Sequence, residues 1–138
     1  MNARILCAYD GSATAEKAFD YALALAAAFG GRLSVLAVAQ PPESAEVMET
    51  ETLVDSMRAH FMTLFESLRM RAEGTPVSPE FEVTVGHPAE QILFQADALG
   101  ADHIVIGHRG KSRIERWLMG SISKRIIAYA ACNVTVVR

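Results

Sequence analysis

The sequence predicts a single α/β domain built on an open parallel sheet with helices on both faces. Three observations support this prediction. Short apolar segments alternate with segments of helical periodicity, an order that requires crossover connections between parallel strands. The 138 residues have the length of one domain, residues 1–138, without an internal repeat or a linker. Hydrophobic residues make up 51% and charged residues 21% of the chain, a composition that excludes intrinsic disorder.

The first strand and helix have the clearest signals. Residues 4–9 are a continuous apolar run that ends at the turn 10–12, as expected of a strand buried on both faces. Ser12 or Thr14 can cap the following helix, and Gly30 ends it, because glycine accepts the left-handed C-cap conformation. Apolar residues at helical spacing define the expected buried face: Ala18, Tyr21, Ala22, Leu25 and Phe29.

The middle of the chain predicts a second strand at residues 33–39 and then a long helical pattern over residues 43–73. Its first part, residues 43–52, is acidic and weakly patterned, so we expect a loop or a frayed helix there. The second part carries one apolar stripe, which we expect in the core: Val54, Met57, Phe61, Leu64, Phe65 and Leu68. His60 lies next to this stripe, and we expect it to be partly buried.

The second half repeats the alternation. Residues 81–85 alternate with period two, which indicates a strand with one partly exposed face. Pro88 suits the first turn of the next helix, and Gly100 ends it. That helix has an apolar face formed by Ile92, Leu93, Ala96 and Leu99. The remaining expected elements are a strand at 103–106, a basic loop to residue 119, a helix from Gly120-Ser121 and a strand at 134–137.

Ligands of open parallel sheets bind beyond the carboxyl ends of the strands, where the strand order reverses. Six of the 13 Lys and Arg residues lie between residues 109 and 125, a segment that includes the loop expected after the fourth strand. Glu115 is the one acidic residue of that segment. Because the net charge is −3, this pattern favours a local anion site over a nucleic-acid-binding face, and we expect no nucleic-acid partner. A solvated helix surface is the alternative explanation of the same charges.

Residues 107–123 are the richest candidate segment. Gly107 and Gly110 follow a buried strand, where the backbone must approach a ligand closely or turn with positive φ. Gly120-Ser121 begins a helix whose free N–H groups and dipole favour an anion. Together they predict a main-chain cradle for phosphates. The alternative is a surface loop with ordinary turn glycines.

Other nucleotide and phosphate motifs are excluded. A Walker A loop needs a glycine where Val105 stands, and the turn after the first strand lacks the G-x-G-x-x-G dinucleotide fingerprint. The third strand ends at Val85-Gly86, without the phosphorylatable aspartate of a receiver domain. The four histidines lack zinc-ligand spacing, and neither Cys7, expected in the core, nor Cys132 has a C-x-x-C partner for redox chemistry.

The spacing G-x2-G-x9-G-[ST] over residues 107–121 resembles the ATP-binding branch of the universal stress protein family. Several further segments match that family in the same order: Ile5 to Ser12 with its Asp-Gly-Ser turn, the G-x-P-x-x-x-I run at 86–92, residues 101–107, residues 120–123 and residues 133–137. The resemblance therefore covers nearly the whole chain.

The resemblance implies a five-stranded sheet in the order 3-2-1-4-5, the adenine nucleotide alpha hydrolase-like variant of the Rossmann-like fold, and ATP with Mg²⁺ as the ligand. By position, the adenine and ribose contacts are Ala8, Tyr9, Asp10 and Val38. The phosphate cradle is Gly107, Arg109, Gly110, Gly120, Ser121 and Ile122, with Ser123 as a further hydroxyl. The Asp10 carboxylate can also assist a phosphate-bound Mg²⁺, or it can simply cap the next turn. His108 and Arg113 depart from the family pattern and bear on phosphate geometry.

We therefore expect a cytosolic, regulatory ATP-binding stress protein. The alternative is a nucleotide-free dimeric interaction module of the same fold. Efficient catalysis is not expected, because no nucleophile–base pair and no water-orienting group is visible, although slow ATP hydrolysis is compatible with the sequence. Two cysteines form no disulfide framework, and the apolar runs are too short to span a bilayer, so we expect a cytoplasmic protein without a membrane partner.

The last predicted strand indicates a homodimer. Val134, Thr135, Val136 and Val137 are β-branched, and neither Pro nor Lys interrupts them. An edge strand presents unpaired N–H and C=O groups, and antiparallel pairing of two copies across a two-fold axis satisfies both edges at once. The resemblance implies the same arrangement. Shielding of this edge by residues 43–52 or by a loop is the alternative.

Overall fold

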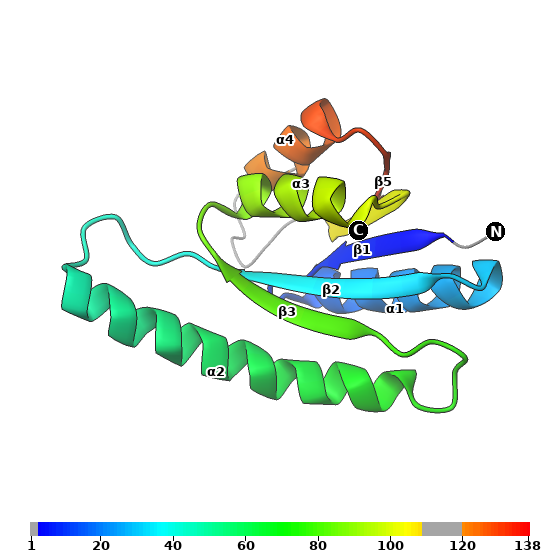
Figure 1. Ribbon diagram of the computed structural model, residues 1–138, viewed down its shortest axis with the longest axis horizontal. Helices are drawn as coiled ribbons and strands as arrows, with labels where there is room; N and C mark the ends of the chain where they lie inside the picture. Colours follow the sequence, from blue (N-terminus) through cyan, green and yellow to red (C-terminus); the bar gives the residue numbers. More distant parts are fainter. Residues whose placement is uncertain (1–2, 109–119) are drawn as a thin grey trace.

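The computed structural model describes residues 3–108 and 120–138. In these residues, strands and helices alternate in the predicted order (Figure 1). The strands are β1 (Arg4–Ala8), β2 (Arg32–Ala39), β3 (Glu80–Val85), β4 (His103–Gly107) and β5 (Asn133–Val137). The helices are α1 (Ala13–Phe29), α2 (Val47–Ala72), α3 (Pro88–Leu99) and α4 (Ser121–Tyr129). None of the described helices is long and apolar enough to cross a membrane.

All strand pairs are parallel, and the order across the sheet is β3-β2-β1-β4-β5. This confirms the predicted topology. From β1 the chain first moves outward to β2 and β3, then returns to the other side of β1 for β4 and β5. The strand order therefore reverses between β1 and β4, in the middle of the sheet, and β3 and β5 are its two edges.

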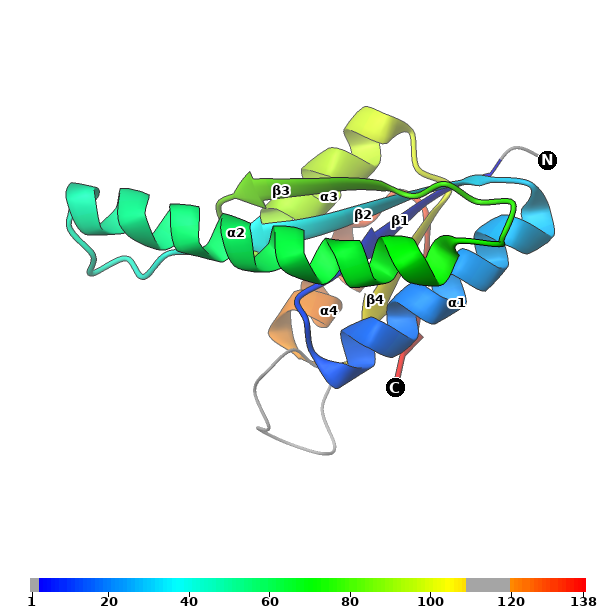
Figure 2. The same ribbon diagram turned by 90° about the horizontal axis from the view of Figure 1, so that it is seen from below.

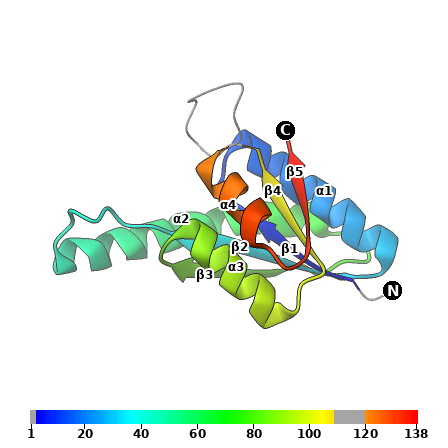
Figure 3. The same ribbon diagram turned by 90° about the horizontal axis from the view of Figure 1, so that it is seen from above.

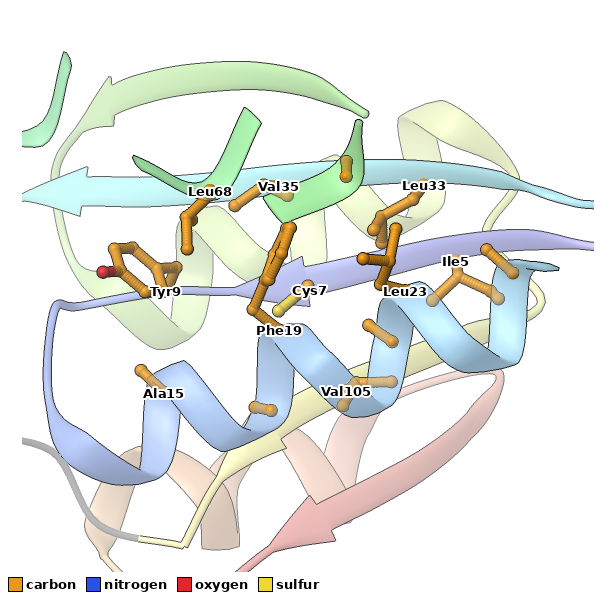
Figure 4. Close-up of a cluster of buried hydrophobic side chains, with 14 of the residues drawn as sticks. Ile5, Cys7, Tyr9, Ala15, Phe19, Leu23, Leu33, Val35, Leu68 and Val105 are labelled. Carbon is orange, nitrogen blue, oxygen red and sulfur yellow. The ribbon is translucent and has the colours of Figure 1, made fainter. Parts of the chain in front are cut away.

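Two helical layers cover the sheet. Helices α1 and α2 lie in front of it in Figure 2, and α3 and α4 lie in front of it in Figure 3. The core under α1 and α2 includes Cys7, Phe19, Phe65, Leu68 and Val105, several of which are drawn in Figure 4. The core under α3 and α4 includes Leu6, Leu36, Ile92, Ile104 and Ile126. The alternation of side chains along β1 and β4 thus supplies both cores, which explains their continuous apolarity.

The buried face of α1 differs from the predicted one. Ala18 and Ala22 are buried as expected, but Tyr21 and Phe29 are 46% and 47% exposed. The face that meets the sheet is instead Ala15, Ala18, Phe19, Ala22, Leu23 and Ala26. Alanines let the helix approach the strands closely, and the pattern of so apolar a helix does not distinguish its two apolar stripes.

Helix α2 begins at Val47, so residues 43–46 are a loop and the acidic residues that follow are helical. Phe61, Phe65 and Leu68 are buried as predicted. The predicted partial burial of His60 is wrong: it is exposed, because its position on the helix turns it away from the stripe that meets the sheet.

Strand β5 lies at the edge opposite β3. Its residues 134–137 are half-buried, and Val134 and Val136 pack against the core under α3 and α4. Helix α2 packs on β2 and β3, near the opposite edge of the sheet, so residues 43–52 do not shield the β5 edge.

Candidate functional site

The carboxyl ends of β1 and β4 adjoin each other at the point where the strand order reverses. In open parallel sheets this is the position of the ligand crevice. Ala8 ends β1 here and residues 9–10 follow it, while Gly107 ends β4 and His108 follows it. Gly120, the N-cap of α4, donates its N–H to the carbonyl of His108 at 3.2 Å. The fold therefore brings the predicted segments together from separate parts of the chain.

Asp10 shapes the turn between β1 and α1. Its Oδ1 accepts a hydrogen bond from the N–H of Ser12 at 2.9 Å, and the intervening Gly11 has a φ of 83°. Ser12 in turn caps α1, its Oγ accepting from the N–H of Ala15 at 3.2 Å. The capping role foreseen for Asp10 is thus present. The carboxylate remains half-exposed at the edge of the sheet, with a second oxygen to offer a ligand.

Tyr9 adjoins the site through its main chain. Its ring is 4% exposed and lies in the core, with its centroid 6.3 Å from that of Phe65 (Figure 4). Burial, and then a hydrogen bond with Glu16, raise the pKa of the Tyr9 hydroxyl. Its N–H donates to the carbonyl of Leu36 at 2.9 Å, which continues the pairing with β2. Ala8 and Val38, half-buried, lie on the other face of the sheet, beside the core under α3 and α4.

Gly107 is required by packing. A Cβ built on it would lie 2.6 Å from Oγ1 of Thr14 and 3.0 Å from the Thr14 carbonyl carbon. Its φ is not among the positive values of the described glycines, so close approach of the first turn of α1, rather than a left-handed turn, is the reason for glycine here. This contact presses the start of α1 against the end of β4.

His108 connects three elements through its main chain. Its N–H donates to the carbonyl of Val137 at 2.6 Å, and its carbonyl accepts from Gly120. The side chain is 8% exposed, and Nδ1 has no hydrogen-bond partner among the described residues. The sequence marked His108 as a departure from the family pattern, but nothing in the sequence indicated this role at the junction of β4, β5 and α4.

Ser123 is placed inside the protein. It is 4% exposed, and its Oγ donates to the carbonyls of Gly107 at 3.1 Å and His108 at 3.4 Å. These bonds fasten the first turn of α4 to the end of β4. The geometry therefore favours a structural role for this hydroxyl over the ligand contact that the resemblance implied.

Within residues 3–108 and 120–138, no side chain caps the N-terminus of α4. Gly120 is the N-cap residue, and helix geometry leaves the N–H groups of Ser121, Ile122 and Ser123 without an intrahelical acceptor. Ser121 and Ile122 are exposed. The positive end of the helix dipole adds to these donors, so this terminus is suited to an anion such as a phosphate. Arg109, Gly110 and Arg113 lie outside the described residues.

The described residues contain no group of three or more His, Cys, Asp or Glu side chains that could hold a metal ion. A Mg²⁺ ion commonly binds one or two carboxylates and completes its shell with substrate phosphates and water. Asp10 is the carboxylate at this edge that fits such a partial set. The donor set therefore suits a magnesium–phosphate ligand better than a resident metal.

Comparison with known proteins decides the family. Residues 1–138 match the model of the universal stress protein family. The chain belongs to the universal stress protein family. It is 34% identical to a universal stress protein of Thermus aquaticus over 136 residues, which cover 97% of each chain. It is 30% identical to universal stress protein YxiE of Bacillus subtilis, over 98% of each chain.

Solved structures of the family share the fold. The universal stress protein UspA of Lactobacillus plantarum matches with a TM-score of 0.91 and 26% identity, over 99% of this chain and 97% of that one. Two more distant structures are complexes with adenine nucleotides. One universal stress protein was solved with cAMP (TM-score 0.76, 23% identity), and one from Archaeoglobus fulgidus with dAMP (TM-score 0.71, 19% identity). Each covers at least 99% of this chain.

Proposed function

We propose that this universal stress protein binds ATP, with Mg²⁺, at the carboxyl edge between β1 and β4, and that nucleotide occupancy regulates it in a stress response. The observation that carries the proposal is the N-terminus of α4, which no described side chain caps and which adjoins the end of β4 at the reversal of strand order. A helix start with free donors at this point is a phosphate-binding feature. The two nucleotide complexes of the same fold support an adenine nucleotide as the ligand.

Each group has a distinct role in this proposal. The N–H groups of Ser121 and Ile122 donate hydrogen bonds to phosphate oxygens, while Ser123 and Gly107 stabilise the cradle through contacts inside the protein. Asp10 faces the ribose or the phosphate-bound Mg²⁺, and the main chain at Tyr9 adjoins the adenine. Mg²⁺ supplies charge neutralisation of the phosphates. We propose binding without efficient turnover, since among these groups we identify no water-orienting base.

Binding of ATP to Gly120→Val tests the proposal. The branched side chain obstructs the entrance to α4, so we expect ATP affinity to fall by at least tenfold, about 1.4 kcal/mol, while the fold persists. Ala128→Val, an exposed change in the same helix, is the matched control. Equilibrium dialysis with and without Mg²⁺ measures both. If the wild type binds no ATP in either condition, the protein is instead a nucleotide-free interaction module.

We further propose that the protein is a homodimer through β5. The carbonyl of Val137 faces β4, where it accepts from His108, so the N–H groups of Val134 and Val136 point to the open edge. Val136→Pro removes one outward donor and leaves the β4 pairing intact. Sedimentation equilibrium is expected to give a dimer for the wild type and for Val136→Ala, which keeps the N–H, and a monomer for Val136→Pro. A dimer that survives the proline places the interface elsewhere.

A further inference from the structure

The N-terminal half of α2, residues 47–60, projects beyond the carboxyl ends of the strands, and we call it the arm (Figures 1 and 2). None of its residues is buried, whereas the second half of the same helix buries Phe61, Phe65, Leu68 and Ala72. The arm therefore gains little from the core of this chain. A helical segment of this length depends on packing of an apolar face for its stability.

The apolar stripe of α2 continues along the arm. Val47, Val54 and Phe61 follow one another at intervals of seven residues, two helical turns, so they share the face that meets the core farther along. On the arm, Val47 is 77% exposed and Leu53 is 38% exposed, while Val54 and Met57 are half-buried. The loop before α2 runs alongside the arm (Figure 1), yet Val47 and Leu53 stay exposed. An apolar strip is thus left open to solvent.

Acidic side chains border this strip. No Lys or Arg occurs between Arg32 and Arg58, and five carboxylates occur in that stretch: Glu43, Glu46, Glu49, Glu51 and Asp55. Helix geometry places Glu49 and Glu51 on opposite sides of the strip. The ion pairs found in the described residues include none of these five. The arm therefore combines an apolar strip with unneutralised negative borders.

We propose that the arm binds a basic amphipathic helix of a partner protein. The apolar face of such a helix covers the strip, and its Lys or Arg side chains meet the carboxylates at the borders. Met57 suits this contact, because its flexible side chain adapts to different apolar surfaces. A second copy of the chain fits less well, since pairing two arms brings like charges together. The proposal is independent of nucleotide binding.

A labelled peptide with leucine and lysine at helical spacing is the probe, and fluorescence anisotropy measures its binding. We expect Val47→Ser/Leu53→Ser to weaken binding of this peptide by at least about tenfold, because both substitutions remove apolar contact area from the strip. We expect Glu49→Gln/Glu51→Gln to weaken it clearly. Glu66→Gln/Glu73→Gln removes the same charge from the second half of the helix and its C-cap, and leaves the affinity unchanged.

The other outcomes overturn the proposal. No binding by the wild type does so directly. An equal loss in both glutamine pairs, or equal binding of a lysine–serine peptide, shows general attraction to an acidic protein. Sedimentation of the wild type and of Val47→Ser/Leu53→Ser tests the remaining occupant: association beyond a dimer that the serines abolish assigns the arm to a second copy. Circular dichroism verifies that each variant keeps its helices.

Discussion

Two helix starts belong to the candidate site, and they are built in different ways. The β1–α1 turn is stabilised by its own side chains, because Asp10 accepts from Ser12 and Ser12 caps α1. At the start of α4, Gly120 donates its N–H to the carbonyl of His108, and no described side chain caps the helix. A side-chain cap satisfies one of the free N–H groups of a helix start, whereas an uncapped start leaves that donor for an anion. The difference favours the start of α4 over the start of α1 as the proposed phosphate site.

The largest expected effect comes from forcing the start of α1 away from the end of β4. Gly107→Val places a branched side chain against the side chain and the backbone of Thr14. Relieving this clash requires a shift of the backbone of α1 or β4, which costs stability. We expect a loss of about 3 kcal/mol in the free energy of unfolding. Urea denaturation measures it. A stability near that of the wild type contradicts the close contact between α1 and β4.

Giving α4 the cap it lacks reverses the comparison. Gly120→Asp supplies a side-chain acceptor and a negative charge at the N-terminus of the helix, so the free protein gains a few tenths of a kcal/mol. The same carboxylate competes with phosphate for the donors and repels it. We therefore expect ATP affinity to fall about tenfold or more, the equivalent of about 1.4 kcal/mol, by calorimetric titration. Tighter ATP binding in this variant contradicts the assignment of the cradle.

Removing the cap that α1 possesses has a smaller effect. Ser12→Ala leaves the N–H of Ala15 without its acceptor, and we expect a loss of about 1 kcal/mol in stability. Ser121→Ala is the matched control, because the structure shows no capping role for that hydroxyl, and it leaves the unfolding curve unchanged. Equal losses in the two variants show that the two helix starts do not differ as described.

The smallest effect concerns the residue before Asp10. The pKa of Tyr9 is raised from its ordinary 10.0, chiefly by burial. Above that pH the tyrosine loses its proton in the unfolded chain while Tyr9 of the folded protein keeps it. The folded state therefore loses stability as the pH rises above about 10. Tyr9→Phe costs about 0.5 kcal/mol at neutral pH, through the lost hydrogen bond with Glu16, and has a flatter stability profile between about pH 8 and about pH 11. Tyr129→Phe, an exposed change, keeps the wild-type profile.

The elements and their order were predictable because their signals are local. The apolar run before Asp10, the glycine that ends α1 and the proline that begins α3 each act within a few residues. The strand order followed from the family resemblance. The buried face of α1 was mispredicted because its two apolar stripes differ only in how closely alanine lets the helix approach the sheet.

The sequence predicted which segments adjoin at this edge of the sheet, and less of what their residues do there. Gly107 was identified, but its reason is a contact with Thr14, which lies far away in the sequence. The inward bonds of Ser123 and the main-chain contacts of His108 depend on how β4 meets α4 and β5. Periodicity reports which face of an element is apolar, and it contains no information on such junctions between distant elements.

The main chain of His108 connects the two surfaces proposed for binding. Through one peptide unit on each side, this residue joins the start of α4 to the end of β5, and therefore the candidate phosphate donors to the open edge of the sheet. The start of α4 and the end of β5 are therefore separated by a single residue's hydrogen bonds. Any coupling between the two is reciprocal. If a bound nucleotide stabilises pairing at β5 by a given free energy, pairing at β5 stabilises nucleotide binding by the same amount.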